Sequence, residues 1–66
     1  MKKNLLRAEM RRVGDTDGML AAYLGMSQST FSHKINGHVE FVQSEIAKIK
    51  ERYRLTARQV DTIFFS

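Results

Sequence analysis

Residues 20–37 have the sequence LAAYLGMSQSTFSHKING. An apolar segment, a glycine and a small polar segment follow one another, which predicts two short helices joined by a tight turn. Gly25 is placed to end the first helix, because glycine adopts the left-handed backbone without a side-chain penalty. Ser27 is placed to cap the second helix, since its hydroxyl can accept a free backbone N–H. Local residue chemistry therefore predicts both the hairpin and the position of its turn.

The second helix of this pair has one apolar and one polar face. Phe31 and Ile35 lie four residues apart and share the face expected to turn toward the core. The outer face carries Gln28, Ser29, Ser32 and His33. A purely structural hairpin would explain the glycine and the apolar spacing equally well, but its solvated face would usually carry Glu and Lys. The pattern is therefore typical of a helix-turn-helix, about residues 17–36, whose second helix enters the DNA major groove.

At these residues the chain resembles the small phage repressors of the Cro/cI type, which have a lambda-repressor-like fold. The shared positions are Leu20-Ala21, Leu24-Gly25, Ser27-Gln28-Ser29-Thr30, Phe31 and Asn36-Gly37. A phage or prophage subgroup is indicated by Lys34-Ile35-Asn36-Gly37, Glu40-Phe41, Ser44-Glu45-Ile46 and Ile63-Phe64-Phe65. The resemblance covers about residues 4–65. It implies a sequence-specific regulator of transcription, a Cro-like repressor, that binds a double-stranded DNA operator, often as a dimer.

The chain departs from the family pattern at two positions. The family often has a polar, phosphate-facing residue such as Gln at the first position of the helix before the turn, and this chain has Asp17. A carboxylate would repel phosphate there. The family commonly caps the fourth helix with Thr or Ser, and this chain has Val42, although Glu45 remains as half of a capping box and Ser44 could shift the helix start.

The helix-turn-helix reading assigns roles on DNA to ten residues. The expected base contacts are made by Gln28, Ser29, Ser32 and His33, with Gln28 suited to adenine. The expected phosphate contacts are made by Ser27, Thr30, Lys34, Asn36, Gly37 and His38, the last three through backbone N–H groups of the loop. His33 could instead be a solvated surface residue, and the Lys34 stem could pack beside the core with its ammonium in water.

Apolar spacing and capping residues extend the prediction to an all-α domain of five helices spanning residues 1–66. The expected helices are 3–13, 17–24, 27–36, 43–53 and 57–65, with Thr16 and the Thr56–Gln59 pair as caps. The residues expected to face inward include Leu5, Leu6, Met10, Val13, Leu20, Leu24, Phe31, Ile35, Phe41, Ile46, Ile49, Tyr53, Val60, Ile63 and Phe64. Phe65 cannot point the same way as Phe64, so it either closes the core or contacts a second copy of the chain.

Composition narrows the class of protein. The net charge is +4, and residues 1–12 alone carry five basic side chains against one acidic one, which favours an anionic partner such as nucleic acid. There is no cysteine and no apolar run near the ~20 residues that span a membrane, and we expect no signal peptide, because only Leu5-Leu6 follows the basic start before Arg7. We therefore expect a protein of the bacterial cytoplasm, associated with the nucleoid, and no small-molecule ligand is indicated.

Catalytic and metal-binding patterns are missing from the sequence. The serines lack a triad context, there is no glycine-rich phosphate loop, and His33 and His38 straddle a helix end as a poor ligand pair. The sequence therefore predicts neither an enzyme nor a cofactor. The rival hypothesis is a protein-interaction module, such as an antitoxin or a partner of a larger repressor. Asp17 and the lack of arginine in the recognition helix favour this rival, whereas the basic N-terminus opposes it.

Overall fold

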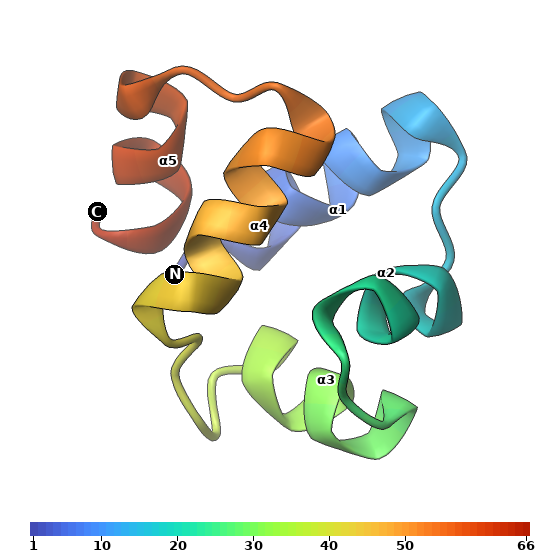
Figure 1. Cartoon of the computed structure of the whole chain (residues 1–66). Coiled ribbons are helices and arrows are strands. Elements are labelled where there is room, and N and C mark those ends of the chain that lie inside the picture. The colour runs from blue at the N-terminus through green and yellow to red at the C-terminus, as the bar shows by residue number, and fades with distance from the viewer.

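Five α-helices and no strands make up the computed structural model, which describes residues 1–66 (Figure 1). The helices are α1 (Lys3–Val13), α2 (Asp17–Leu24), α3 (Gln28–Ile35), α4 (Gln43–Tyr53) and α5 (Ala57–Phe64). The predicted all-α, five-helix class is confirmed, and every helix begins within one residue of its expected position. None of the helices combines the length and the hydrophobicity needed to cross a bilayer.

Capping residues explain where the helices begin. Thr16, Ser27 and Thr56 are extended, and each side-chain oxygen accepts a backbone N–H three residues later, at 3.1 Å in all three cases. Ser27 is therefore a cap and not the first residue of α3. Gln59 completes the capping box of α5, because its side-chain oxygen accepts the backbone N–H of Thr56. Gly25 ends α2 with a φ of 75°, as its place in the sequence predicts.

Val42 is the N-cap residue of α4. It has no hydroxyl, so its side chain cannot accept a backbone N–H of the helix. Glu45 supplies the other half of the box, because its carboxylate accepts the Val42 N–H at 3.0 Å. The helix begins at Gln43, so Ser44 does not shift its start. At the other end of α4, Arg54 adopts a left-handed backbone with a φ of 53°, a conformation usually left to glycine.

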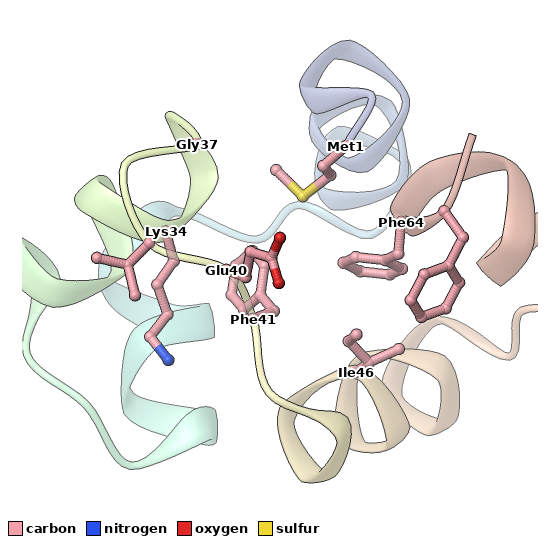
Figure 2. Close-up of a pocket in the computed structure, with 9 residues that line it drawn as sticks. Met1, Lys34, Gly37, Glu40, Phe41, Ile46 and Phe64 are labelled. Carbon is pink, nitrogen blue, oxygen red and sulfur yellow. The ribbon is translucent and has the colours of Figure 1, made fainter.

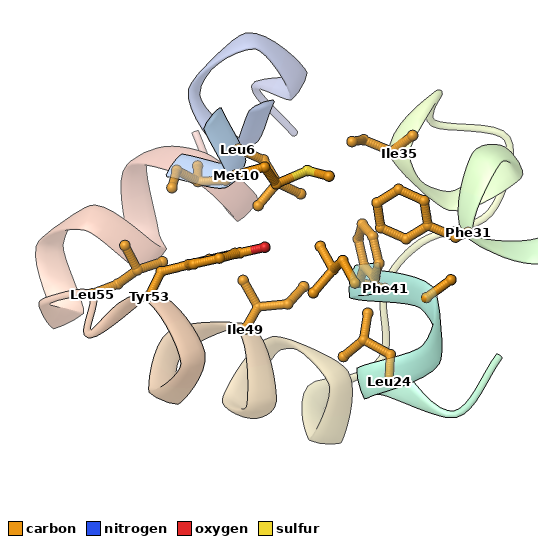
Figure 3. Packing of buried hydrophobic residues seen from close by; sticks show 12 residues of the cluster. Leu6, Met10, Leu24, Phe31, Ile35, Phe41, Ile49, Tyr53 and Leu55 are labelled. Carbon is orange, nitrogen blue, oxygen red and sulfur yellow. The ribbon is translucent and has the colours of Figure 1, made fainter. Parts of the chain in front are cut away.

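The core lies between two groups of helices. α2 and α3 pack against each other as the hairpin, while α1, α4 and α5 contact one another on the other side (Figure 1). Phe31 and Ile35 of α3 point into this core together with Ile49 of α4 (Figure 3). The Phe31 ring lies 6.1 Å from the ring of Phe41, which anchors the loop between α3 and α4. The apolar face of α3 is thereby fixed to the rest of the molecule.

Two residues expected inside are exposed. Val13 is 47% exposed and Leu5 is 40% exposed. Val13 is the last residue of α1, and the chain turns away at Gly14, so no element covers it. Leu5 lies beside the buried Leu6 but outside the stripe that faces the core. Leu55, which the periodicity did not single out, is buried at the position just before the Thr56 cap, where a hydrophobic residue often packs onto its helix.

A polar cluster ties the turn between α1 and α2 to α4. The Asp15 carboxylate, with 3% of its side chain exposed, accepts hydrogen bonds from Arg52 at 2.6 and 2.8 Å. It also accepts the Tyr53 hydroxyl at 2.6 Å. The Arg52 guanidinium lies 4.6 Å from the centre of the Tyr23 ring, which adds a contact to α2. We call these four residues the Asp15 cluster; it holds the hairpin against α4.

Candidate nucleic-acid interface

The outer face of α3 is polar and open to solvent. Gln28, Ser29 and His33 are exposed, and Ser32 is half-buried, while Phe31 and Ile35 on the opposite face are fully buried. Four of the predicted site residues therefore lie together on one side of one helix. Because the inner face is held by core packing, this outer face has a fixed orientation relative to the fold.

Ser27 and Thr30 are linked at the start of α3. Ser27 accepts the Thr30 backbone N–H and donates its hydroxyl proton to the Thr30 side-chain oxygen at 3.0 Å. Both side chains are exposed. The capping role predicted for Ser27 is confirmed, and its only O–H donor is taken up by Thr30.

Gln28, the first residue of α3, lies against the first turn of α2. A Cβ atom added at Gly18 would lie 3.4 Å from the Gln28 side-chain oxygen. The beginnings of the two helices are therefore adjacent in space, although ten residues separate them in the sequence. A Cβ at position 18 would only touch the Gln28 side chain, so the distance shows contact between the two helix beginnings and not a need for glycine.

The loop after α3 uses its backbone donors internally. The N–H groups of Asn36, Gly37 and His38 donate to the carbonyls of Ser32, Lys34 and His33, at 3.0, 3.1 and 2.9 Å. These N–H groups are therefore occupied within the chain in this conformation, and their expected contacts with phosphate stay a prediction. Only side chains remain to bind an anion here, and Gly37 has none; its φ of 85° serves the turn.

Lys34 is engaged with α4. Its ammonium lies 2.7 Å from the Glu45 carboxylate, and its side chain is only 11% exposed. Burial opposes ionisation of Glu45, but the hydrogen bonds from Lys34 and from the Val42 N–H hold its pKa below the usual value. Of the two predictions for Lys34, the structure matches packing beside the core, although the ammonium meets Glu45 and not water alone.

Two residues of α1 reach the helical hairpin. Arg7 donates to both carboxylate oxygens of Asp17, at 2.8 and 3.4 Å, so the charge of Asp17 is balanced. Lys3 donates to the Asn36 side chain at 3.1 Å, and Asn36 in turn donates to Ser32 at 3.3 Å. Lys3 has no acidic partner, so it brings an unbalanced positive charge to the end of α3. The sequence showed a basic N-terminus but not which of its side chains lie here.

The chain segment that contains α3 carries no carboxylate, and the nearby carboxylates of Asp17 and Glu45 are paired with Arg7 and Lys34. No Asp or Glu occurs between residues 18 and 39. The exposed imidazoles of His33 and His38 lie with their centres 6.0 Å apart, edge to face. No three His, Cys, Asp or Glu residues lie close enough together to hold a metal ion. The face therefore presents hydrogen-bonding groups, and Lys3 adds a positive charge at its end.

Comparison with known proteins adds no family or relative. No protein-family model matches the chain, and neither does any curated protein or solved structure.

Proposed function

We propose that this protein is a sequence-specific regulator of transcription that binds double-stranded DNA, of the phage repressor type that its sequence resembles. One observation carries the proposal: α3 presents an exposed face of Gln28, Ser29, Ser32 and His33 while Phe31 and Ile35 anchor it in the core. Base recognition in the major groove requires hydrogen-bonding side chains on the exposed face of a helix that is held in place by the fold.

The proposed contacts divide between bases and phosphates. Gln28 has the donor and acceptor pair that matches adenine, and His33 can donate to a guanine acceptor. Thr30 and Asn36 are exposed and each keeps one donor hydrogen for phosphate beside its bonds within the chain, His38 is exposed as well, and Lys3 adds charge beside Asn36. Ser27, Lys34 and Gly37 are assigned supporting roles, because their polar groups are used within the chain.

The experiment begins with selection of bound sequences from a random duplex library by the purified protein. Fluorescence anisotropy then compares the enriched duplex with a scrambled one across a salt series. We expect the enriched duplex to bind at least a thousandfold more tightly, with affinity for both falling steeply as salt rises. Failure to enrich any sequence, or equal binding to both duplexes, would contradict the proposal.

Gln28→Ala separates base reading from general attraction. Loss of one bidentate base contact is worth about 1–3 kcal/mol, so we expect binding to the enriched duplex to weaken about 10- to 100-fold. Binding to the scrambled duplex should change less than about twofold, because Gln28 carries no charge. Thr62→Ala on α5 is the matched control, since it also truncates an exposed polar side chain. Equal weakening on both duplexes would remove Gln28 from the base contacts.

A homodimer on DNA is part of the proposal. Phe65 is 65% exposed and lines a pocket of about 120 Å³ with Met1, Val39 and Phe64. Figure 2 shows Phe64 between Met1 and Ile46 at this pocket, which also borders Lys34 and Gly37 at the end of α3. Two copies meeting here would bring the ends of both α3 helices toward the contact, because the pocket borders Lys34 and Gly37. Binding to successive major grooves would require the two helices to lie ~34 Å apart.

Phe65→Ala tests the dimer. Removing an aromatic side chain from a self-complementary contact should weaken the complex of two proteins per duplex at least about tenfold. Sedimentation of protein with enriched duplex gives the stoichiometry. A wild-type protein that stays monomeric both free and on DNA would refute the dimer. That result would not contradict the proposed binding of DNA by α3.

The rival function is that of a protein-interaction module. It is favoured by α3 itself, which has no arginine and whose single lysine is paired with Glu45. A module of this kind would enrich no sequence from the duplex library. Gln28→Ala would leave its affinity for the protein partner unchanged.

A further inference from the structure

The Arg7–Asp17 ion pair lies at the surface where α1 meets the start of α2. Each carboxylate oxygen of Asp17 accepts a hydrogen bond from one guanidinium nitrogen of Arg7. The side chains are 33% and 32% exposed, so both charges face solvent and remain within reach of a large anionic partner. The pair as a whole carries no net charge.

The position of this pair follows from the contact between the two helix beginnings. Gly18, the neighbour of Asp17, lies against the Gln28 side chain at the start of α3. In helix-turn-helix docking, the start of the second helix contacts base edges while the first helix crosses the DNA backbone. The Arg7–Asp17 pair therefore lies on the side of the hairpin that the backbone would pass.

We infer that Asp17 limits the electrostatic part of DNA binding by holding Arg7, and so keeps the affinity for non-specific DNA low. This inference rests on the proposed function. A protein gains salt-dependent affinity for each phosphate that a cation neutralises. Arg7 paired with Asp17 releases no counterion, whereas Arg7 without that partner would. Because non-specific binding is almost entirely electrostatic, a carboxylate here increases discrimination between specific and non-specific sites.

The test measures salt dependence for Asp17→Asn. With the carboxylate gone, Arg7 is free to neutralise one more phosphate, so the slope of log affinity against log salt should steepen by about 0.9. At 0.1 M salt the affinity for the scrambled duplex should rise about fivefold to tenfold. Exposed ion pairs contribute little to folding stability, so the variant should remain folded, and circular dichroism checks this.

Two further variants make the result specific. Arg7→Ala leaves Asp17 unbalanced beside the backbone, so its affinity for both duplexes should fall below that of the wild type. Glu9→Gln is the matched control, because Glu9 also pairs with an arginine on α1, but it lines the groove against α5 with Arg58 and Gln59. Its slope should stay within about 0.3 of the wild type, because Glu9 lies on the side of α1 that faces α5 and not beside the hairpin.

The outcomes distinguish the inference from the proposed function. A wild-type protein with no preference for the enriched duplex would overturn the proposed function. A wild-type preference accompanied by equal slopes for Asp17→Asn, Glu9→Gln and wild type would overturn only the inference. A steeper slope confined to Asp17→Asn, together with weaker binding by Arg7→Ala, supports it.

Discussion

Phe31→Ala is expected to lower the free energy of unfolding by about 3–5 kcal/mol, the largest effect of any substitution considered. Phe31 is 0% exposed and packs against Phe41 at the centre of the core (Figure 3). Truncation would remove this contact and leave a cavity. A chain of this length has a total stability of about 3–10 kcal/mol, so the variant should be largely unfolded or close to it at 37 °C.

Urea unfolding followed by circular dichroism measures this loss. Phe65→Ala is the matched control, because it removes the same atoms from a side chain that is 65% exposed. Its stability should lie within about 0.5 kcal/mol of the wild type, measured at a concentration where the free protein is monomeric. Equal losses for the two variants would show that the core is not organised around Phe31.

Asp15→Asn is expected to cost about 2–4 kcal/mol. The amide would keep one acceptor oxygen but place an NH2 group where the other stood, so at least one buried donor of Arg52 or Tyr53 would lose its acceptor and Arg52 would lose its counter-charge. The value lies at the lower end of that for fully buried pairs, since the Arg52 side chain is 26% exposed. For a domain of this size the melting temperature should fall by about 10–25 °C. Asp61→Asn, an exposed acid on α5, is the control and should melt as the wild type does.

The same variant should change the response to acid. The hydrogen bond from Arg52 is the largest cause that holds the pKa of Asp15 below its usual value; it outweighs burial, and the Tyr53 hydroxyl acts in the same direction. A lowered pKa in the folded state means that the stabilisation is complete above the unfolded value of about 3.9 and is lost as pH falls below it. Wild-type stability should therefore drop below about pH 4, while Asp15→Asn shows a smaller drop. Parallel curves for the two proteins would contradict this.

Helix bounds and turns could be predicted because their causes are local. Thr16, Ser27 and Thr56 cap helices with their own side chains, and Gly25 meets a backbone requirement at its own position. Periodicity likewise placed Phe31 and Ile35 on the buried face. It failed for Val13, since a helix face is buried only where another element reaches it, and that depends on where the chain turns.

For the candidate site, the sequence predicted which residues occupy the outer face of α3 but not how their polar groups are used. Occupation of the Asn36, Gly37 and His38 N–H groups by α3 carbonyls depends on the path of the loop. Their contacts with DNA, like those of Gln28 and His33, stay predictions for the experiments above.

The sequence by itself determined the helices, their caps and the two faces of α3, because these depend on neighbours within about four residues. Only the tertiary structure decided three of the four ion pairs, since Glu9 and Arg12 are neighbours on α1. Asp15 meets Arg52 across 37 positions, Lys34 meets Glu45 across 11, and Arg7 meets Asp17 across 10. Long charged side chains have no periodicity that identifies a partner, and their pairing follows from how whole helices pack. That packing turned Asp17 from an expected source of repulsion into half of an ion pair.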